Sequence, residues 1–154
     1  MEKDCGAWIN LLSRMVKKRL NTTLQGLGIT AIQSRVIFYI LDHYEQQPVF
    51  QRDIESAFQL SRSTATGILQ QLEKKGILRR ESVASDARLK SLVPTEQAAE
   101  LGCQVRACLR QIEQVLTRGL SDGQVQLFRE TLAAMADNLQ QAELSEAAPE
   151  VPAP

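Results

Sequence analysis

The sequence predicts a mainly α-helical fold with one small β-hairpin. Over most of the chain, apolar residues recur at steps of three and four, which places them on one face of a helix. Near residue 77 the pattern changes to short runs that are typical of two strands. Hydrophobic residues make up 44% of the chain and aromatic residues only 5%, so we expect an aliphatic core. A length of 154 residues suits one domain.

Two helices are expected in the first third of the chain. The first covers about residues 4–26, where the apolar side chains share one face and Gly28 follows the end. The second begins at Thr30, which forms a capping box with Gln33 three positions later, and it ends before Pro48. The long apolar face of the first helix is more than a small core is expected to cover.

A short helix and a well-capped helix follow in close succession. The short helix is predicted over residues 51–58, and a tight turn separates it from Ser61. Ser61 is a good N-cap, because its hydroxyl can accept from the free amides of the next turn. The helix that it starts runs to about Lys75, and Gly76 supplies the left-handed residue that ends it. This order is typical of a helix-turn-helix.

A basic hairpin is expected after Gly76. Residues 77–81 and 89–93 are predicted strands, and residues 82–88 a polar loop between them. Residues 61–90 carry a net charge of +4, whereas the whole chain is neutral. A local basic patch on a neutral protein is what phosphate contact at one surface requires.

Two helices and a tail complete the predicted order. Thr95 caps a long helix that reaches about residue 118, and Ser121 with Gln124 forms a second capping box before a last helix with a long apolar face. From Glu143 onward the chain holds acids and prolines but no basic residue, so we expect it to be disordered.

The helix after Ser61 carries polar residues near its start that are candidates for DNA contact. A helix-turn-helix places its second helix in the major groove, where each base pair shows a distinct pattern of donors and acceptors. Hydroxyls there could donate to phosphates, and Thr64 or Thr66 could place a methyl group against thymine. An amphipathic helix with solvated hydroxyls is the alternative. The candidates are Arg62, Ser63, Thr64, Thr66 and Gln70.

The hairpin adds a second group of candidates, Asp86, Arg88 and Lys90. Their cations could lie along or in a minor groove, whose potential favours arginine. Asp86 lies two residues before Arg88 and could pair with it and fix its direction. A solvated surface turn is the alternative for the hairpin taken alone.

These segments resemble the MarR family of regulators. The resemblance rests on LSRSTATGILQQLEKKGILRRES (60–82) and on SDARLKSLVPTEQA (85–98). The second is similar to the family's wing signature, an aspartate and an arginine two apart, then a basic residue, a short strand and a threonine-capped helix. The resemblance implies a winged helix-turn-helix in an obligate homodimer, palindromic double-stranded DNA operators, usually repression, and often release by a small effector.

The resemblance also implies the roles of the segments. Residues 1–29 would be an N-terminal dimerisation helix, 30–94 the winged helix-turn-helix lobe, 95–142 the C-terminal dimerisation helices and 143–154 a disordered acidic and proline-rich tail. The candidates of the capped helix take the recognition positions, and those of the hairpin take the wing. Gly67 departs from many relatives, which carry a larger and often basic residue there, so one possible base contact is missing.

The candidate redox and effector sites each have a functional and a structural interpretation. Some relatives sense peroxides through a cysteine near the position of Cys5, so Cys5 is a candidate redox sensor or an incidental thiol. An aromatic or drug-like effector could bind at Trp8, Met15, Tyr39 and His43, for which core packing or surface exposure is the alternative. With one histidine in the chain, we expect no metal site and no cofactor.

Several classes of protein are disfavoured. The chain shows no secretory signal and no apolar run long enough to span a membrane, so we expect a cytoplasmic protein. Motifs of thiol enzymes, serine hydrolases and phosphate-binding loops are absent from the sequence, so we expect no enzyme. The alternatives to a DNA-binding regulator are a winged-helix module that docks proteins and a thiol-based regulator that uses Cys5.

Overall fold

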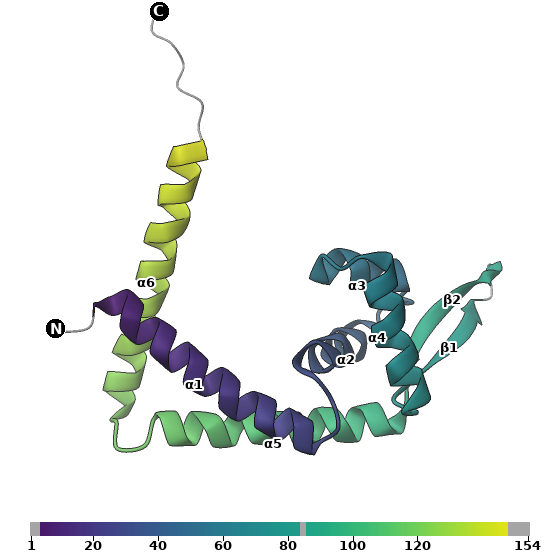
Figure 1. Cartoon of the computed structure of the whole chain (residues 1–154), viewed down its shortest axis with the longest axis horizontal. Helices are drawn as coiled ribbons and strands as arrows, with labels where there is room; N and C mark the ends of the chain where they lie inside the picture. Colours follow the sequence, from purple (N-terminus) through teal and green to yellow (C-terminus); the bar gives the residue numbers. More distant parts are fainter. Residues whose placement is uncertain (1–3, 84–85, 148–154) are drawn as a thin grey trace, which may run out of the picture. The chain divides into compact units, whose positions relative to one another are not determined.

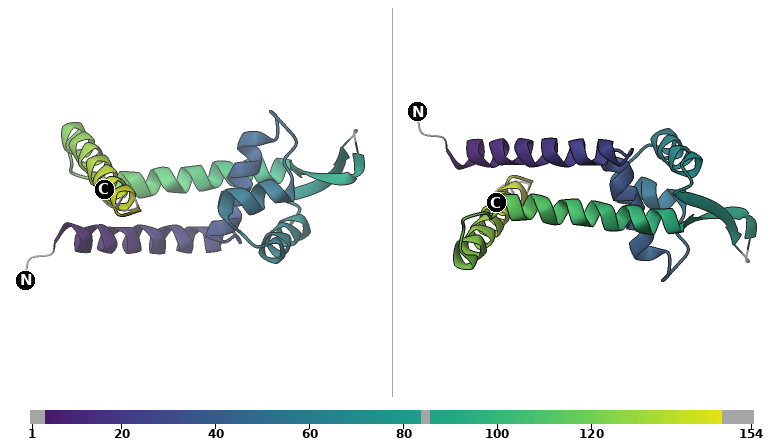
Figure 2. Two further views of the ribbon diagram at one scale, coloured as in Figure 1. Left: turned by 90° about the horizontal axis from the view of Figure 1, so that it is seen from above. Right: turned by 90° about the horizontal axis from the view of Figure 1, so that it is seen from below.

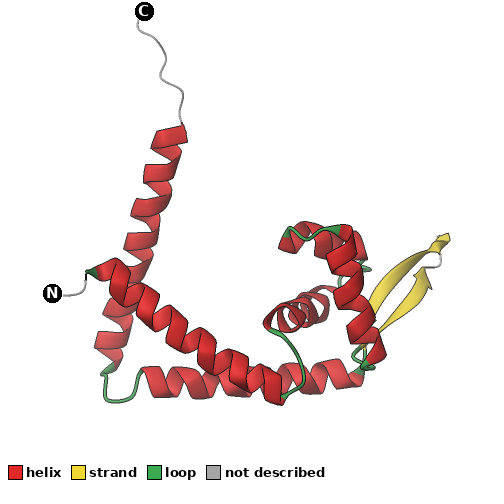
Figure 3. Cartoon of the chain, viewed as in Figure 1, coloured by secondary structure: helices red, strands yellow, loops and turns green. Residues whose placement is uncertain are grey.

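The computed structural model describes residues 4–83 and 86–147, with the exception of the side chains of residues 86–88 and 146–147. The chain forms two compact units that divide after Glu113. Helices dominate both units, and one antiparallel hairpin completes the first, as the sequence predicts (Figure 3). The elements are, in chain order (Figure 1), α1 (Cys5–Gly26), α2 (Ala31–His43), α3 (Gln51–Phe58), α4 (Arg62–Lys74), β1 (Leu78–Val83), β2 (Asp86–Pro94), α5 (Glu96–Leu116) and α6 (Asp122–Ala147).

Side-chain caps start the helices where the sequence predicts them. The Gln33 amide donates to Thr30 Oγ1 at 3.3 Å, and the Thr30 amide donates to Gln33 Oε1 at 3.1 Å, which completes the capping box of α2. Ser61 Oγ accepts from the Thr64 amide at 3.2 Å at the start of α4. The opposite end of α4 is closed by Gly76, whose φ of 70° lies in the left-handed region that favours glycine.

One aliphatic core holds α4 and the wing in the same unit. Helices α2, α3 and α4 gather where α1 ends and α5 begins (Figure 2). Because α4 and both strands contribute to this core, burial of apolar surface fixes the recognition helix and the hairpin relative to each other. The buried side chains include Leu24, Ile40, Ile54, Leu69, Leu72, Leu78, Leu92, Leu101 and Val105.

The hairpin is longer than the sequence predicts. β1 continues to Val83 and β2 begins at Asp86, so most of the predicted loop over residues 82–88 belongs to strands. Arg80 pairs with Leu92 and Ser82 with Lys90, and the register is irregular between Ser82 and Val83. The prediction was wrong here because pairing of backbone amides and carbonyls can extend a ribbon regardless of how polar its side chains are.

A third backbone segment joins the base of the wing. The Leu92 amide donates to the Val49 carbonyl at 2.7 Å, which forms an isolated antiparallel bridge. Val49 lies next to Phe50, the N-cap residue of α3, so this bridge ties the entrance of the helix-turn-helix to β2. A single bridging residue has no periodicity, and the sequence therefore did not predict it.

A polar network ties the end of α4 to the turn between α1 and α2. Lys75 Nζ donates to the Gly28 carbonyl at 2.6 Å. The Gln33 side chain, in a residue that is only 2% exposed, donates to Gln71 Oε1 at 2.7 Å. These contacts join the two segments at points more than thirty residues apart in the sequence.

Helix α6 extends further than expected. It continues to Ala147, so residues 143–147 are helical rather than disordered, and residues 148–154 lie outside the described part of the chain. Ser145 Oγ donates to the Gln141 carbonyl at 2.9 Å within this extension. No proline lies between Asp122 and Pro149, and the glutamates and alanines of this stretch are good helix formers, which explains the extension.

Apolar side chains remain exposed in each unit. On α1 they are Trp8, Ile9, Leu12 and Met15, and on α6 they are Leu127, Phe128, Leu139 and Leu144. Within residues 4–83 and 86–147, no single helix is long and apolar enough to cross a membrane, and α1 and α2 meet that requirement only together, across a bend of 77°.

Candidate nucleic-acid interface

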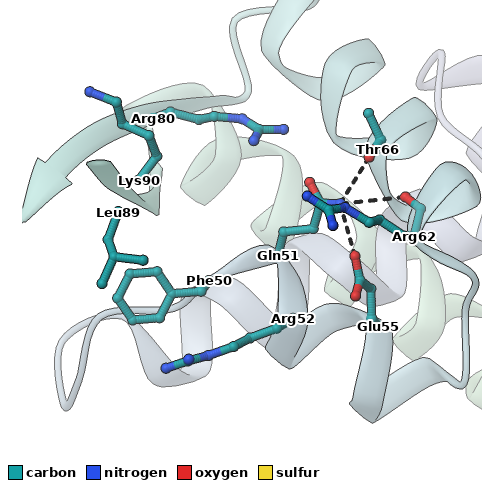
Figure 4. A pocket seen from close by; sticks show the side chains of 9 residues that line it. All are labelled: Phe50, Gln51, Arg52, Glu55, Arg62, Thr66, Arg80, Leu89 and Lys90. Atoms are coloured by element: carbon teal, nitrogen blue, oxygen red, sulfur yellow. Dashed lines mark hydrogen bonds between the residues drawn. The ribbon is translucent and has the colours of Figure 1, made fainter. Parts of the chain in front are cut away.

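An open groove lies between the helix-turn-helix and the wing. Its volume is about 580 Å³, and its walls come from the first turns of α3 and α4 and from both strands (Figure 4). Four of its residues are basic, which gives the groove the positive lining that a phosphate backbone requires. The lining residues are Phe50, Gln51, Arg52, Glu55, Arg62, Thr66, Arg80, Leu89 and Lys90.

The start of α4 presents hydroxyl groups to solvent. Ser61 Oγ lies 3.1 Å from Ser63 Oγ and 2.8 Å from Thr64 Oγ1, and all three residues are exposed. The free amides of the first helical turn and the helix dipole add partial positive charge at the same place. The helix start therefore offers a cluster of hydrogen-bond donors suited to an anionic or acceptor-rich surface.

The predicted recognition residues do not share one environment. Arg62 is exposed at the edge of the groove, and Gln70 is exposed two turns further along α4. Thr66 is half-buried, and its hydroxyl accepts a hydrogen bond from Gln51 Nε2 at 2.8 Å. Of the predicted set, Thr66 is thus the half-buried residue, and α3 holds its side chain.

Gly67 lies between these residues on the same helix. A Cβ built on Gly67 meets no heavy atom within 4 Å apart from the adjoining backbone. The position therefore has room for a side chain, and the fold does not require glycine there.

The wing contributes one described candidate, Lys90. It is exposed, and its Nζ donates to Ser82 Oγ on the paired strand. The other two wing candidates, Asp86 and Arg88, belong to β2 by their backbone, but their side chains lie outside the described part of the chain.

Six of the groove residues were not among the predicted contacts. The Arg52 guanidinium lies 5.2 Å from the centre of the Phe50 ring and 3.9 Å from Asp53. Phe50 and Leu89 face one another from opposite walls (Figure 4). Arg52 could have been predicted to line the groove, because it is a basic residue in the first turn of the short helix. Nothing in the sequence around Leu89 indicates such a position.

Arg80 and Glu55 complete the unpredicted part of the lining. Arg80 forms an ion pair with Glu73 of α4 at 3.1 Å. Glu55 accepts from Gln51 Nε2 at 2.9 Å. A carboxylate in a basic groove balances part of its charge and directs neighbouring donors.

The candidate effector residues separate into two places. Trp8 and Met15 are exposed on α1. On α2, the rings of Tyr39 and His43 stack with their centres 4.2 Å apart, and His43 Nδ1 lies 2.7 Å from the Tyr39 carbonyl. None of the four lines the groove between the helix-turn-helix and the wing. An effector site made of these residues stays a prediction.

The thiols are free in the described residues. Cys5 is exposed at the first position of α1, next to the Asp4 carboxylate that caps this helix by accepting from the Ala7 amide at 2.7 Å. Cys103 is exposed and Cys108 half-buried on α5. Redox sensing by Cys5 stays a prediction.

Comparison with known proteins agrees with this geometry. The sequence model of the MarR family matches residues 27–89, which run from the turn before α2 into β2. The structure of a mutant of S. aureus MepR is similar at 25% identity with a TM-score of 0.82, covering 89% of this chain and 99% of the other. A MepR mutant bound to an oligodeoxyribonucleotide matches at 26% identity with a TM-score of 0.72, covering 90% and 99%. MepR bound to ethidium bromide matches at 25% identity with a TM-score of 0.67, covering 89% and 97%.

Proposed function

Because the chain belongs to the MarR family of winged helix-turn-helix regulators, we propose that it binds a palindromic DNA operator as a homodimer and regulates transcription. The observation that carries this proposal is the basic groove, in which Arg62 from the start of α4 and Lys90 from the wing line one surface. The family assignment also makes it a DNA-binding protein rather than an enzyme.

In the proposed complex, α4 enters the major groove with its N-terminal end first. The exposed side chains of Arg62, Ser63 and Thr64 then face base edges and flanking phosphates. The hairpin, anchored on the same core as α4, extends to the neighbouring minor groove, where Lys90 and Arg88 supply cations. Phosphate contacts position the protein, and the contacts of α4 with bases provide the specificity.

The homodimer is proposed from the apolar faces of α1 and α6. Several large apolar side chains exposed on one element favour an interface there. Four large apolar side chains on each of these helices are exposed in the single chain. A two-fold dimer presents two copies of α4, which matches two half-sites about one helical turn apart.

Repression and release by a small effector complete the proposal. Support comes from MepR, for which structures with an oligodeoxyribonucleotide and with ethidium bromide exist. We propose an aromatic or drug-like effector for this chain, and Trp8, Met15, Tyr39 and His43 remain the candidate contacts. We propose that this regulator acts in the cytoplasm.

The experiment that tests the proposal is selection of duplexes from a genomic fragment library by the purified protein, followed by binding curves across a salt series. We expect enrichment of an inverted repeat and an affinity that falls steeply with salt, because bound phosphates release counterions. Arg62→Ala should weaken binding, whereas Arg14→Ala, which removes an exposed arginine from α1, should not. No enriched sequence, or binding that ignores salt, would contradict the proposal and favour a protein-docking module.

A further inference from the structure

The groove contains a hydrogen-bonded arrangement around Gln51 that bears on how α4 contacts DNA. Gln51 opens α3, and its side chain crosses to α4 (Figure 4). Its Nε2 atom donates to Thr66 Oγ1 at 2.8 Å and to Glu55 Oε1 at 2.9 Å, and lies 3.4 Å from the Arg62 carbonyl. One amide group thus joins the first helix of the helix-turn-helix to the second.

The partners fix which way the Gln51 amide faces. A carboxylate and a backbone carbonyl can only accept hydrogen bonds, so Glu55 and the Arg62 carbonyl both require the NH₂ end of the amide. Thr66 Oγ1 lies at the same end, and an amide NH₂ cannot accept. The Thr66 hydroxyl therefore receives a hydrogen bond from Gln51 and must direct its own hydrogen elsewhere.

The usual internal acceptor for that hydrogen is already occupied. Threonine hydroxyls in helices often donate to the carbonyl four residues earlier, as Thr22 does to Lys18 and Thr23 to Arg19 in α1. For Thr66 that carbonyl belongs to Arg62, and its two lone pairs serve the helical Thr66 amide and Gln51 Nε2, which lies 3.4 Å away. The groove, which Thr66 lines, is the direction that remains open to its hydroxyl hydrogen.

We propose that Gln51 is a positioning residue that makes Thr66 a hydrogen-bond donor towards DNA. This inference rests on the proposed function of the groove. A hydroxyl that accepts one hydrogen bond becomes a stronger donor and a weaker acceptor. Thr66 is half-buried and lines the groove, so its proton meets an acceptor atom of DNA, on a base edge or on a phosphate. The same contact selects one rotamer of Thr66 and so fixes where its methyl group lies.

The test is a double-mutant cycle on the selected operator. Thr66→Val removes the donor and keeps the shape, and we expect it to weaken binding about threefold to tenfold, the range for one hydrogen bond. Gln51→Leu should weaken binding by a similar factor, and the double variant should bind no worse than Thr66→Val alone. Binding of Gln51→Leu with unchanged affinity, or additive losses in the double variant, would overturn the inference.

A swap of the two α3 side chains separates positioning from stability. In the double variant Gln51→Glu with Glu55→Gln, net charge is unchanged, but residue 51 becomes an acceptor to which Thr66 donates. We expect this double variant to lose as much operator affinity as Thr66→Val does. The dependence of its affinity on salt should stay unchanged, since no phosphate-binding cation is removed. Full affinity in this swap would contradict the donor role. Melting midpoints check folding, and Gln51→Asn, whose amide is one methylene too short to reach Thr66, replaces Gln51→Leu if that variant fails to fold.

A matched control exists on α6. There Gln126 Nε2 donates to Glu130 Oε1 at 2.8 Å, which is the same contact at the same spacing as Gln51 with Glu55. Gln126→Leu should leave operator affinity unchanged.

The outcomes distinguish this inference from the proposed function. If the wild type selects no duplex, both fail. If the wild type selects an operator that Gln51→Leu binds equally well, the function stands and this inference fails. A loss confined to one base pair in each half-site identifies a base acceptor. A loss reproduced by a methylphosphonate at one backbone position identifies a phosphate.

Discussion

Arg80 Nε of β1 donates to Glu73 Oε2 of α4 at 3.1 Å, and this ion pair joins the wing directly to the recognition helix. The two side chains are 29% and 30% exposed, so solvent screens the pair only in part. The hairpin is otherwise held at its base, through the core and the bridge to Val49. The ion pair thus restrains the direction in which the strands leave the core.

Breaking this pair should loosen the wing without unfolding the protein. We expect Glu73→Gln to lower the free energy of unfolding by about 1 kcal/mol or less, as for a partly exposed pair, and to weaken operator binding. A double-mutant cycle with Arg80→Gln, measured by urea denaturation, isolates the coupling between the two side chains. Lys74→Gln, which removes a neighbouring exposed charge, is the control for a general charge effect. Additive effects of Glu73→Gln and Arg80→Gln would show that the pair is not coupled.

Gly67→Ala should stabilise the protein. Glycine within a helix costs roughly 0.5–1 kcal/mol relative to alanine, and the added methyl group meets no atom within 4 Å beyond the adjoining backbone. We expect a higher urea midpoint with an unchanged m-value. Gly76→Ala is the opposite control, because its φ of 70° strains any residue with a Cβ, and it should destabilise. A lower midpoint for Gly67→Ala would mean that this position requires glycine.

Arg88→Ala tests the wing. We expect operator affinity to fall by about 1–3 kcal/mol, the usual cost of one lost minor-groove or base contact. Fluorescence anisotropy at moderate salt measures the operator affinity. Arg110→Ala, which removes an exposed arginine from α5, is the matched control and should leave this affinity unchanged. Superimposable curves for Arg88→Ala and the wild type would exclude this arginine from the interface.

Leu139→Lys tests the proposed dimer. The side chain is 69% exposed on α6 in the single chain, and a lysine in an apolar interface would be buried without a partner. We expect light scattering at micromolar concentration to report a smaller mass for this variant than for the wild type. Gln140→Lys adds the same charge at the adjacent exposed position and should leave the mass unchanged. A monomeric wild type would refute the dimer.

Local signals in the sequence predicted the helices well, because helix ends depend on neighbouring residues. Thr30 with Gln33 and Ser61 cap α2 and α4 as expected, since each cap needs only amides three positions away. The same signals predict the exposed start of α4, and with it Arg62, from the sequence alone.

Contacts between distant residues could not be predicted in this way. The side chain of Gln51 reaches Thr66, fifteen positions away, and the bridge of Val49 to Leu92 spans a still longer stretch. Both depend on how α3 and β2 pack against the core, which no local pattern encodes. The strands were predicted too short for a related reason, because pairing across the hairpin, rather than the polarity of residues such as Ser82, decides where they end.

The bond from Lys75 to the Gly28 carbonyl has a mechanical consequence. This hydrogen bond connects the C-terminal end of the recognition helix α4 to the turn between α1 and α2, and the buried Gln33 side chain strengthens the connection. Rotation of α1 about that turn would therefore move the N-terminal end of α4, which contacts DNA in the proposed complex. In a dimer, the angle of each α1 would then set the distance between the two α4 helices, so a change at the dimer interface could shift both helices away from the spacing of their half-sites.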